Sequence, residues 1–164
     1  MNLFQIKLSK QELMMKNKML YNCNNISDTI NFAKILVEDL HPRDVICLNG
    51  DLGTGKTVIA KSISKILLVK DEVISPTFNI LKIYNTHNDL IKKIYHFDLY
   101  RIKSHSELDN IGFEEYIYNN DSISIIEWPD IAKEYFIMGY KNITIEFDKN
   151  DENKRLISYE SFER

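Results

Sequence analysis

A glycine-rich segment carries the residue types needed to hold a phosphate group. Residues 50–57 read Gly-Asp-Leu-Gly-Thr-Gly-Lys-Thr, which fits the phosphate-binding pattern G-x-x-x-x-G-K-[ST]. Glycines adopt backbone dihedrals closed to other residues, so successive N–H groups can turn toward one anion. The lysine would reach the β- and γ-phosphates, and the last hydroxyl would bind Mg²⁺. We therefore assign nucleotide contacts to Asp51, Leu52, Gly53, Thr54, Gly55, Lys56 and Thr57, with Lys56 also catalytic and Thr57 also a metal ligand.

The segments on either side supply the strand and the helix that this motif requires. Val45–Leu48 is an unbroken apolar run, typical of a parallel strand that is buried on both faces. The competing interpretation is a glycine-rich turn before an ordinary helix, and the flanking pattern favours a nucleotide site. Apolar residues then recur at near-helical spacing, at Val58, Ile59, Ile63, Ile66 and Leu67.

Two other apolar stretches each end in a carboxylate. Residues 91–98 end in Asp98, and residues 122–127 end in Glu127. Ligands of open α/β sheets bind at the carboxyl ends of the strands, so an acid there is placed to hold Mg²⁺ or its waters opposite Thr57. One acid could serve the metal while the other orients or deprotonates the attacking water. The alternative is that either acid caps the next helix or pairs with a nearby basic residue.

Two polar positions each have two interpretations. Thr29 lies in the first turn of a helix that we expect to begin after an N-cap at Ser27, so it either helps to cap the helix or faces the nucleotide base. Residues 75–77 read Ser-Pro-Thr, and the proline predicts a rigid turn there. The two hydroxyls either sense a γ-phosphate, as a switch loop does, or belong to an ordinary turn between strands.

Trp128 is the only tryptophan, and it directly follows Glu127. Pro129 comes next, and a proline cannot donate to a sheet ladder and restricts the residue before it. We therefore predict that the strand has ended and that Trp128 lies on a loop at the nucleotide pocket. The alternative is an indole packed in the core, because large aromatic side chains are mostly buried.

The other elements complete an α/β fold. We predict a single P-loop NTPase-like domain over residues 18–164, with a mixed, mainly parallel sheet flanked by helices. Residues 1–17, in which Phe4, Ile6 and Leu8 alternate with polar residues, are predicted as a loosely attached extension. The remaining predicted strands are 18–23, 78–84, 143–147 and 155–159, and the remaining predicted helices are 104–110, 113–118 and 130–138, with a hairpin joining 78–84 to 91–98.

Composition limits the classes of function. The chain has 164 residues, 44% of them hydrophobic and 27% charged, as in a soluble globular protein. The formal net charge is −3, whereas a protein that holds nucleic acid by itself usually has a strongly basic face. Partners would therefore contribute most of any RNA binding. Cys23 and Cys47 have no metal or redox spacing, and no apolar run reaches the ~18 residues of a membrane span, so we expect a cytoplasmic protein without a membrane segment.

Four motifs together resemble the TsaE family. They are Gly-Asp-Leu-Gly-Thr-Gly-Lys-Thr at 50–57, Ser-Pro-Thr-Phe at 75–78, His-Phe-Asp-Leu-Tyr-Arg at 96–101 and Glu-Trp-Pro-Asp at 127–130. They occur in the family's order and with similar spacing, and the resemblance covers residues 18–160. Members of this family are small bacterial P-loop ATPases that support threonylcarbamoyladenosine formation in tRNA, next to the anticodon.

The resemblance implies roles that the residues alone leave open. It implies that Thr57 and Glu127 bind Mg²⁺, that Asp98 is a catalytic acid needed for ATP hydrolysis, that Trp128 is a mobile aromatic beside the nucleotide and that Thr29 lies near the base. It also implies ATP and Mg²⁺ as cofactors, TsaB and TsaD as partners, and contact with tRNA only through their complex. Residues 1–17 have no clear counterpart in the family. Family members often carry a Gly-Arg pair where this chain has Asn-Lys-Arg at 153–155, so that contact stays unassigned.

Two other function classes compete with a partner-dependent ATPase. Small-molecule P-loop kinases close an arginine-bearing lid over the phosphates, and this chain has four scattered arginines. A nucleotide-gated binding module is the second, and two carboxylates beside the metal position argue against it. A GTPase is disfavoured because the guanine-reading motif Asn-Lys-x-Asp does not occur.

Overall fold

Strand β2 (Val45–Asn49) lies at the middle of the sheet, and its apolar residues are fully buried. The computed structural model describes residues 14–163, which contain seven strands in the order β1-β7-β6-β2-β5-β4-β3. β2 pairs in parallel with β5 (Ser122–Glu127) and β6 (Gly139–Phe147), and β5 pairs in parallel with β4 (Lys93–Asp98). The other three pairings are antiparallel. The α/β class is as predicted, but the prediction of a mainly parallel sheet is wrong, because hairpins build both edges.

The antiparallel edges extend further than the sequence pattern indicated. β3 (Leu81–Asn85) forms the predicted hairpin with β4, and β7 (Arg155–Glu163) pairs along the whole of β6. β1 (Met14–Cys23) pairs with the outer edge of β7, so β1 begins four residues before its predicted start at Lys18. Residues 14–17 are therefore part of the sheet. The alternating pattern at residues 4–8 lies outside the described residues.

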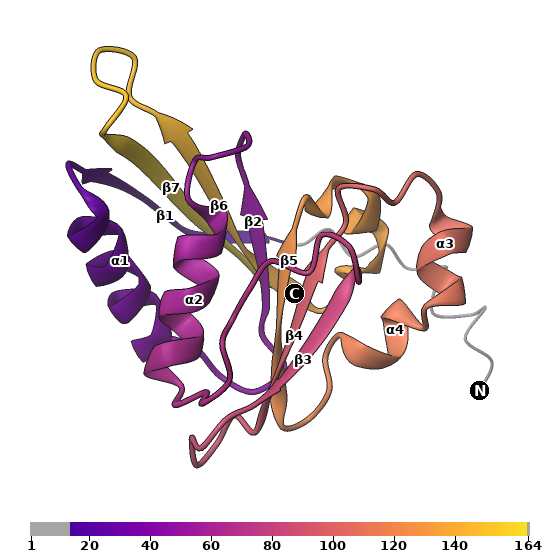
Figure 1. The fold of residues 1–164 in the computed structure, drawn as a ribbon. Coiled ribbons are helices and arrows are strands. Elements are labelled where there is room, and N and C mark those ends of the chain that lie inside the picture. Colours follow the sequence, from indigo (N-terminus) through magenta and orange to yellow (C-terminus); the bar gives the residue numbers. More distant parts are fainter. Residues whose placement is uncertain (1–13, 164) are drawn as a thin grey trace.

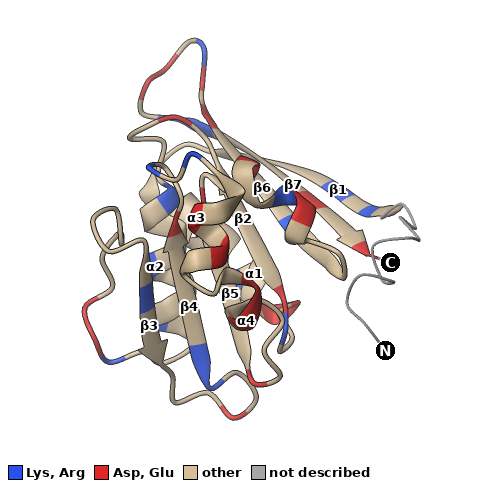
Figure 2. Ribbon diagram, turned by 90° about the vertical axis from the view of Figure 1, so that its right-hand side faces the viewer, with Lys and Arg blue, Asp and Glu red and all other residues tan. Residues whose placement is uncertain are grey.

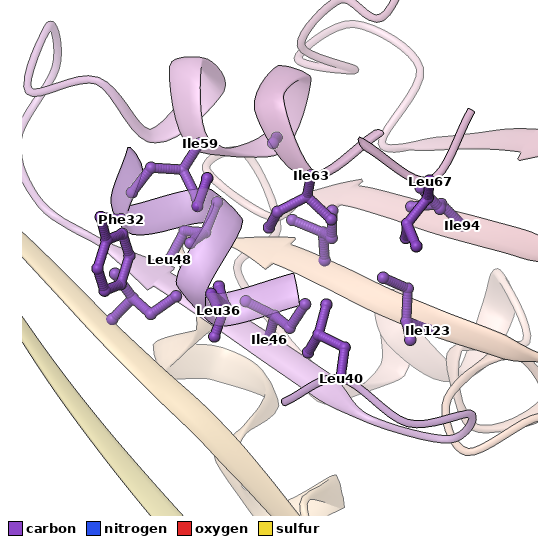
Figure 3. Close-up of a cluster of buried hydrophobic side chains, with 14 of the residues drawn as sticks. Phe32, Leu36, Leu40, Ile46, Leu48, Ile59, Ile63, Leu67, Ile94 and Ile123 are labelled. Carbon is purple, nitrogen blue, oxygen red and sulfur yellow. The ribbon is translucent and has the colours of Figure 1, made fainter. Parts of the chain in front are cut away.

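Helices cover both faces of the sheet (Figure 1). α1 (Ile26–Glu38) and α2 (Lys56–Ile66) lie on one face, and α3 (His105–Asn110), α4 (Phe113–Tyr116) and a 3-10 helix at Pro129–Tyr135 lie on the other. Each face has its own apolar core. Figure 3 shows side chains of the first core, which include Phe32, Leu36, Leu40, Ile46, Leu48, Ile59, Ile63, Leu67, Ile94 and Ile123. None of the described helices is long and apolar enough to cross a membrane.

The N-cap of α1 differs from the prediction. Oδ1 of Asn25 accepts a hydrogen bond from the amide of Asp28 at 3.1 Å, and Asn25 has the extended backbone expected of an N-cap. The carboxylate of Asp28 in turn accepts from the amide of Asn24 at 2.8 Å. Asn25 is therefore the N-cap and the helix begins at Ile26, so the predicted cap at Ser27 is wrong.

The turn at Pro76 is longer than predicted and delays the next strand. The amides of Asn79 and Ile80 both donate to the carbonyl of Pro76, at 2.9 and 2.7 Å, and Ile80 has a left-handed φ of 64°. β3 consequently starts at Leu81 and not at residue 78. After β5, the predicted helix over 130–138 is the 3-10 helix that ends at Tyr135.

Candidate functional site

The glycine-rich loop connects β2 to α2 at the carboxyl end of the parallel strands. All three of its glycines have positive φ, and at Gly50 φ is 138°. A Cβ atom at Gly50 would lie 2.3 Å from the carbonyl oxygen of Ile145 on β6, so only glycine fits between the loop and the sheet. Thr54 closes the loop by donating its hydroxyl proton to the carbonyl of Asp51 at 2.9 Å.

Lys56 lies inside this loop and not in solvent. Only 5% of the residue is exposed, and Nζ donates to the carbonyls of Gly50 at 2.6 Å and Asp51 at 2.9 Å. Burial lowers the pKa of Lys56, and the carboxylates of Glu127 and Asp98 oppose that shift. The loop therefore surrounds a cation that has two carboxylates nearby.

Asp98 ends β4 and is held by hydroxyl groups from the Ser-Pro-Thr turn. Its Oδ2 accepts from Oγ of Ser75 at 3.0 Å and from Oγ1 of Thr77 at 2.7 Å. Its Oδ1 accepts from the amide of Tyr100 at 3.1 Å. Both oxygens of this buried carboxylate are thus engaged, and the turn is fastened to the sheet beside the loop.

Glu127 ends β5 directly beside Asp98, because the two residues are register partners in the parallel β4–β5 pairing. Its Oε1 accepts from Nε2 of His96 at 2.9 Å, and only 3% of Glu127 is exposed. Within residues 14–163, no hydrogen bond reaches Oε2 of Glu127. The structure therefore brings the two predicted acids together and leaves one carboxylate oxygen unengaged.

Trp128 leaves the sheet immediately after Glu127. Its backbone is left-handed, with φ 57° and ψ 56°, and its amide donates to the carbonyl of Leu48 at 3.3 Å. The half-buried indole packs against Tyr100, with ring centroids 5.0 Å apart, and against Nζ of Lys56 at 4.2 Å. The loop position is as predicted, and Trp128 belongs to neither apolar core of the described chain.

Comparison with known proteins identifies the family to which this site belongs. The family model described as "Threonylcarbamoyl adenosine biosynthesis protein TsaE" matches residues 23–157, which is most of the chain. This chain belongs to the TsaE family. The tRNA threonylcarbamoyladenosine biosynthesis protein TsaE of Rickettsia typhi is 42% identical over 85% of this chain and 92% of its own length. The TsaE protein of Bacillus subtilis is 34% identical over 79% of this chain and 78% of its own length.

A solved structure has the same fold. The crystal structure of Bacillus subtilis YdiB matches with a TM-score of 0.69 and 29% identity, covering 90% of this chain and 87% of that one. The resemblance to the TsaE family that the four sequence motifs indicated is thereby confirmed, and the chain is a member of a tRNA-modification family.

Other predicted residues of this TsaE-family chain lie at the loop or in α1. Thr57 is half-buried in the first turn of α2, whereas Asp51 and Leu52 are exposed on the loop. Thr29 is 5% exposed in the first turn of α1. Burial raises the pKa of the Cys23 thiol, and the Thr29 hydroxyl partly offsets that shift, so the two side chains are neighbours. The placement of Thr29 near a nucleotide base stays a prediction.

The contacts of four side chains at this site were not identified from the sequence. His96 was quoted only as part of a family motif, and the hydroxyls of Ser75 and Thr77 were not connected with Asp98. Arg155 was left unassigned, yet its Nε donates to the carbonyl of Thr54 at 2.9 Å and its guanidinium lies 4.2 Å over the ring of Phe147. The only sequence signal for Arg155 was that residues 153–155 stand where other family members often have a Gly-Arg pair.

Two surface cavities lie away from this site. One of about 200 Å³ is lined by residues at the start of β6, including Tyr140 and Lys141, and one of about 270 Å³ lies between β1 and α1. No residue of the glycine-rich loop and neither strand-end acid lines them. The glycine-rich loop and the two strand-end acids lie instead at the carboxyl edge of the parallel strands, where open α/β sheets bind ligands.

Proposed function

We propose that this TsaE-family chain binds ATP and Mg²⁺ through a P-loop at residues 50–57 and hydrolyses the ATP in support of threonylcarbamoyladenosine formation in tRNA. The single observation that carries the proposal is the pair of buried carboxylates, Asp98 and Glu127, aligned in register near the buried Lys56. A buried ammonium with two acids nearby provides charges of both signs, as the hydrolysis of a metal-bound phosphate chain requires.

The available ligands fit Mg²⁺ that is bound together with a nucleotide. Among the described residues, no three His, Cys, Asp or Glu side chains are grouped so that they could hold a metal ion alone. Mg²⁺ is usually held by one or two protein oxygens together with substrate phosphates and water. The hydroxyl of Thr57 and the unengaged Oε2 of Glu127 would supply the protein oxygens. The ion would neutralise charge that develops on the phosphates.

The hydrogen bonds favour different roles for the two acids. Both oxygens of Asp98 accept bonds from fixed donors, so its carboxylate is oriented by Ser75 and Thr77. We assign Asp98 to orienting and deprotonating the attacking water, and Glu127 to the metal. Lys56 would leave its two carbonyl partners to contact the β- and γ-phosphates.

The charge distribution supports a function that depends on partners. Acidic residues mark α3 and α4 in Figure 2, whereas the basic residues of the described chain are scattered over α2, several strands and the loops and do not form one band in this view. With a formal net charge of −3, such a chain has little field to attract a polyanion. We therefore propose that TsaB- and TsaD-type partners supply most of the contact with tRNA.

A hydrolysis assay tests this function. The pure protein should hydrolyse ATP slowly and only with Mg²⁺, and the rate should rise when TsaB, TsaD and tRNA are added together. Turnover that is unaffected by the partners would favour a free-standing kinase or hydrolase. Mg²⁺-dependent ATP binding without any turnover in the full mixture would favour a nucleotide-gated binding module.

Trp128 provides a direct optical test of nucleotide binding. Because its indole packs on Lys56 and Tyr100, displacement of Lys56 by a phosphate should shift the intrinsic fluorescence when Mg²⁺ and ADP are added. Trp128→Phe should keep the midpoint of thermal unfolding while impairing turnover. A spectrum that does not respond to a saturating nucleotide would contradict a role for Trp128 at the pocket.

A further inference from the structure

His96 is a buried polar side chain that has no assigned role in the proposed ATP binding and hydrolysis. It lies on β4 two residues after Ile94 and two before Asp98, and alternate residues of a strand share one face. Ile94 belongs to the same apolar core as Ile59 of α2, so His96 and Asp98 lie on the face of the sheet that α2 covers. The side chain of His96 is 1% exposed and that of its partner Glu127 is 4% exposed. Nε2 of His96 and Oε1 of Glu127 are 2.9 Å apart.

The proton of this imidazole can be assigned from its partners. An ionised carboxylate can only accept, so Nε2 must carry the proton in the bond to Glu127. Nδ1 of His96 is buried and has no hydrogen-bond partner among the described residues. An unpaired buried nitrogen is unfavourable, and an apolar side chain of similar size would avoid it. Packing alone therefore does not explain a histidine at this position.

We propose that His96 is a positioning residue that directs Glu127 toward the Mg²⁺ ion of the bound nucleotide. This inference rests on the proposed function. A glutamate side chain has several rotatable bonds, and the bond from Nε2 holds Oε1 in one orientation, which leaves Oε2 free for the metal. Hydrogen bonds from outside the coordination sphere commonly orient metal ligands in this way, and their loss costs about 10- to 100-fold in metal affinity.

Two amide substitutions distinguish the contribution of a donor at the position of Nε2 from that of one at the position of Nδ1. In His96→Gln the amide nitrogen lies as many bonds from Cβ as Nε2 does, so it can still donate to Glu127. In His96→Asn the amide nitrogen reaches only the position of Nδ1. Both variants bury a similar polar group, so His96→Asn is the matched control, and His96→Leu removes the donor altogether.

The measurement is a Mg²⁺ titration of the binding of a fluorescent ADP analogue to the full chain. His96→Leu and His96→Asn should raise the Mg²⁺ midpoint about 10-fold. His96→Gln should restore most of the affinity, and affinity for the analogue in excess EDTA should be the same in all variants. In a Glu127→Gln background, His96→Leu should cause no further change, because it acts through the carboxylate that has been removed.

The outcomes distinguish this inference from the proposed function. A wild-type protein that binds no ADP, with or without Mg²⁺, overturns both. If the Mg²⁺ midpoint of His96→Leu equals that of the wild type, the positioning role alone is overturned. The same holds if His96→Leu weakens binding of the ADP analogue by the same factor with Mg²⁺ and with EDTA. Nitrogen-15 spectra of the wild-type protein add a test that does not depend on the folding of variants. They should show a proton on Nε2 of His96, and an Nε2 without a proton would overturn the inference.

Discussion

Lys56→Ala is expected to lower ATP turnover by a factor of about 100 or more and to weaken ATP binding, because in the proposed function the γ-phosphate would lose the cation of the glycine-rich loop. The structure supports a large effect, since Nζ is buried within the loop and its position is set by two backbone carbonyls. Calorimetric titration with Mg²⁺ and ATP measures the binding, and the assay with partner proteins measures turnover.

Two further variants separate charge from packing. Lys56→Met keeps most of the aliphatic stem but has no charge, so it should be as inactive as Lys56→Ala while being closer to the wild type in thermal stability. Lys61→Ala removes the same charge from an exposed position of α2 and should leave binding and turnover intact. Unchanged affinity together with unchanged turnover in Lys56→Ala would overturn the P-loop assignment.

Asp98→Asn and Glu127→Gln are expected to impair the protein in different ways. Asp98→Asn should bind Mg²⁺ and ATP normally but slow hydrolysis by about 100-fold, because the attacking water loses its base. Glu127→Gln should raise the Mg²⁺ concentration needed for ATP binding by about 10-fold or more, because a metal-directed carboxylate is lost. Mg²⁺ titrations of binding, combined with single-turnover hydrolysis, separate the two effects.

Asp130→Asn is the control for both substitutions. It removes an exposed carboxylate three residues after Glu127, one that pairs with Lys133 on the surface, and it should have little effect on either measurement. The reverse pattern, with Asp98→Asn shifting the Mg²⁺ midpoint and Glu127→Gln sparing it, would exchange the two roles. Equal loss of binding in both variants would instead mean that both acids bind the metal.

The features of this protein that depend on neighbouring residues could be predicted from its amino-acid sequence. Three of these features are patterns within short stretches of sequence: the apolar run of β2, the glycine-rich loop and the apolar spacing of α2. Their order and chemistry could therefore be recognised without a structure. The same holds for β5, whose predicted bounds agree with the observed Ser122–Glu127, and for the end of that strand at Trp128 and Pro129. The four motifs, each a run of consecutive residues, likewise indicated the TsaE family.

The contacts between side chains that are distant in the sequence could not be predicted without the structure. His96 and Glu127 are 31 residues apart, Thr77 and Asp98 are 21 apart, and Arg155 and Thr54 are 101 apart. Such contacts depend on strand order and register, because one step of register turns every side chain of a strand to the other face. Periodicity shows that a residue lies on a strand, but it does not show which strand will pair with it. For the same reason the pairing of β1 with β7 from Met14 onward was not visible in the sequence. The β3–β4 hairpin could be predicted because a short connection joins its two strands.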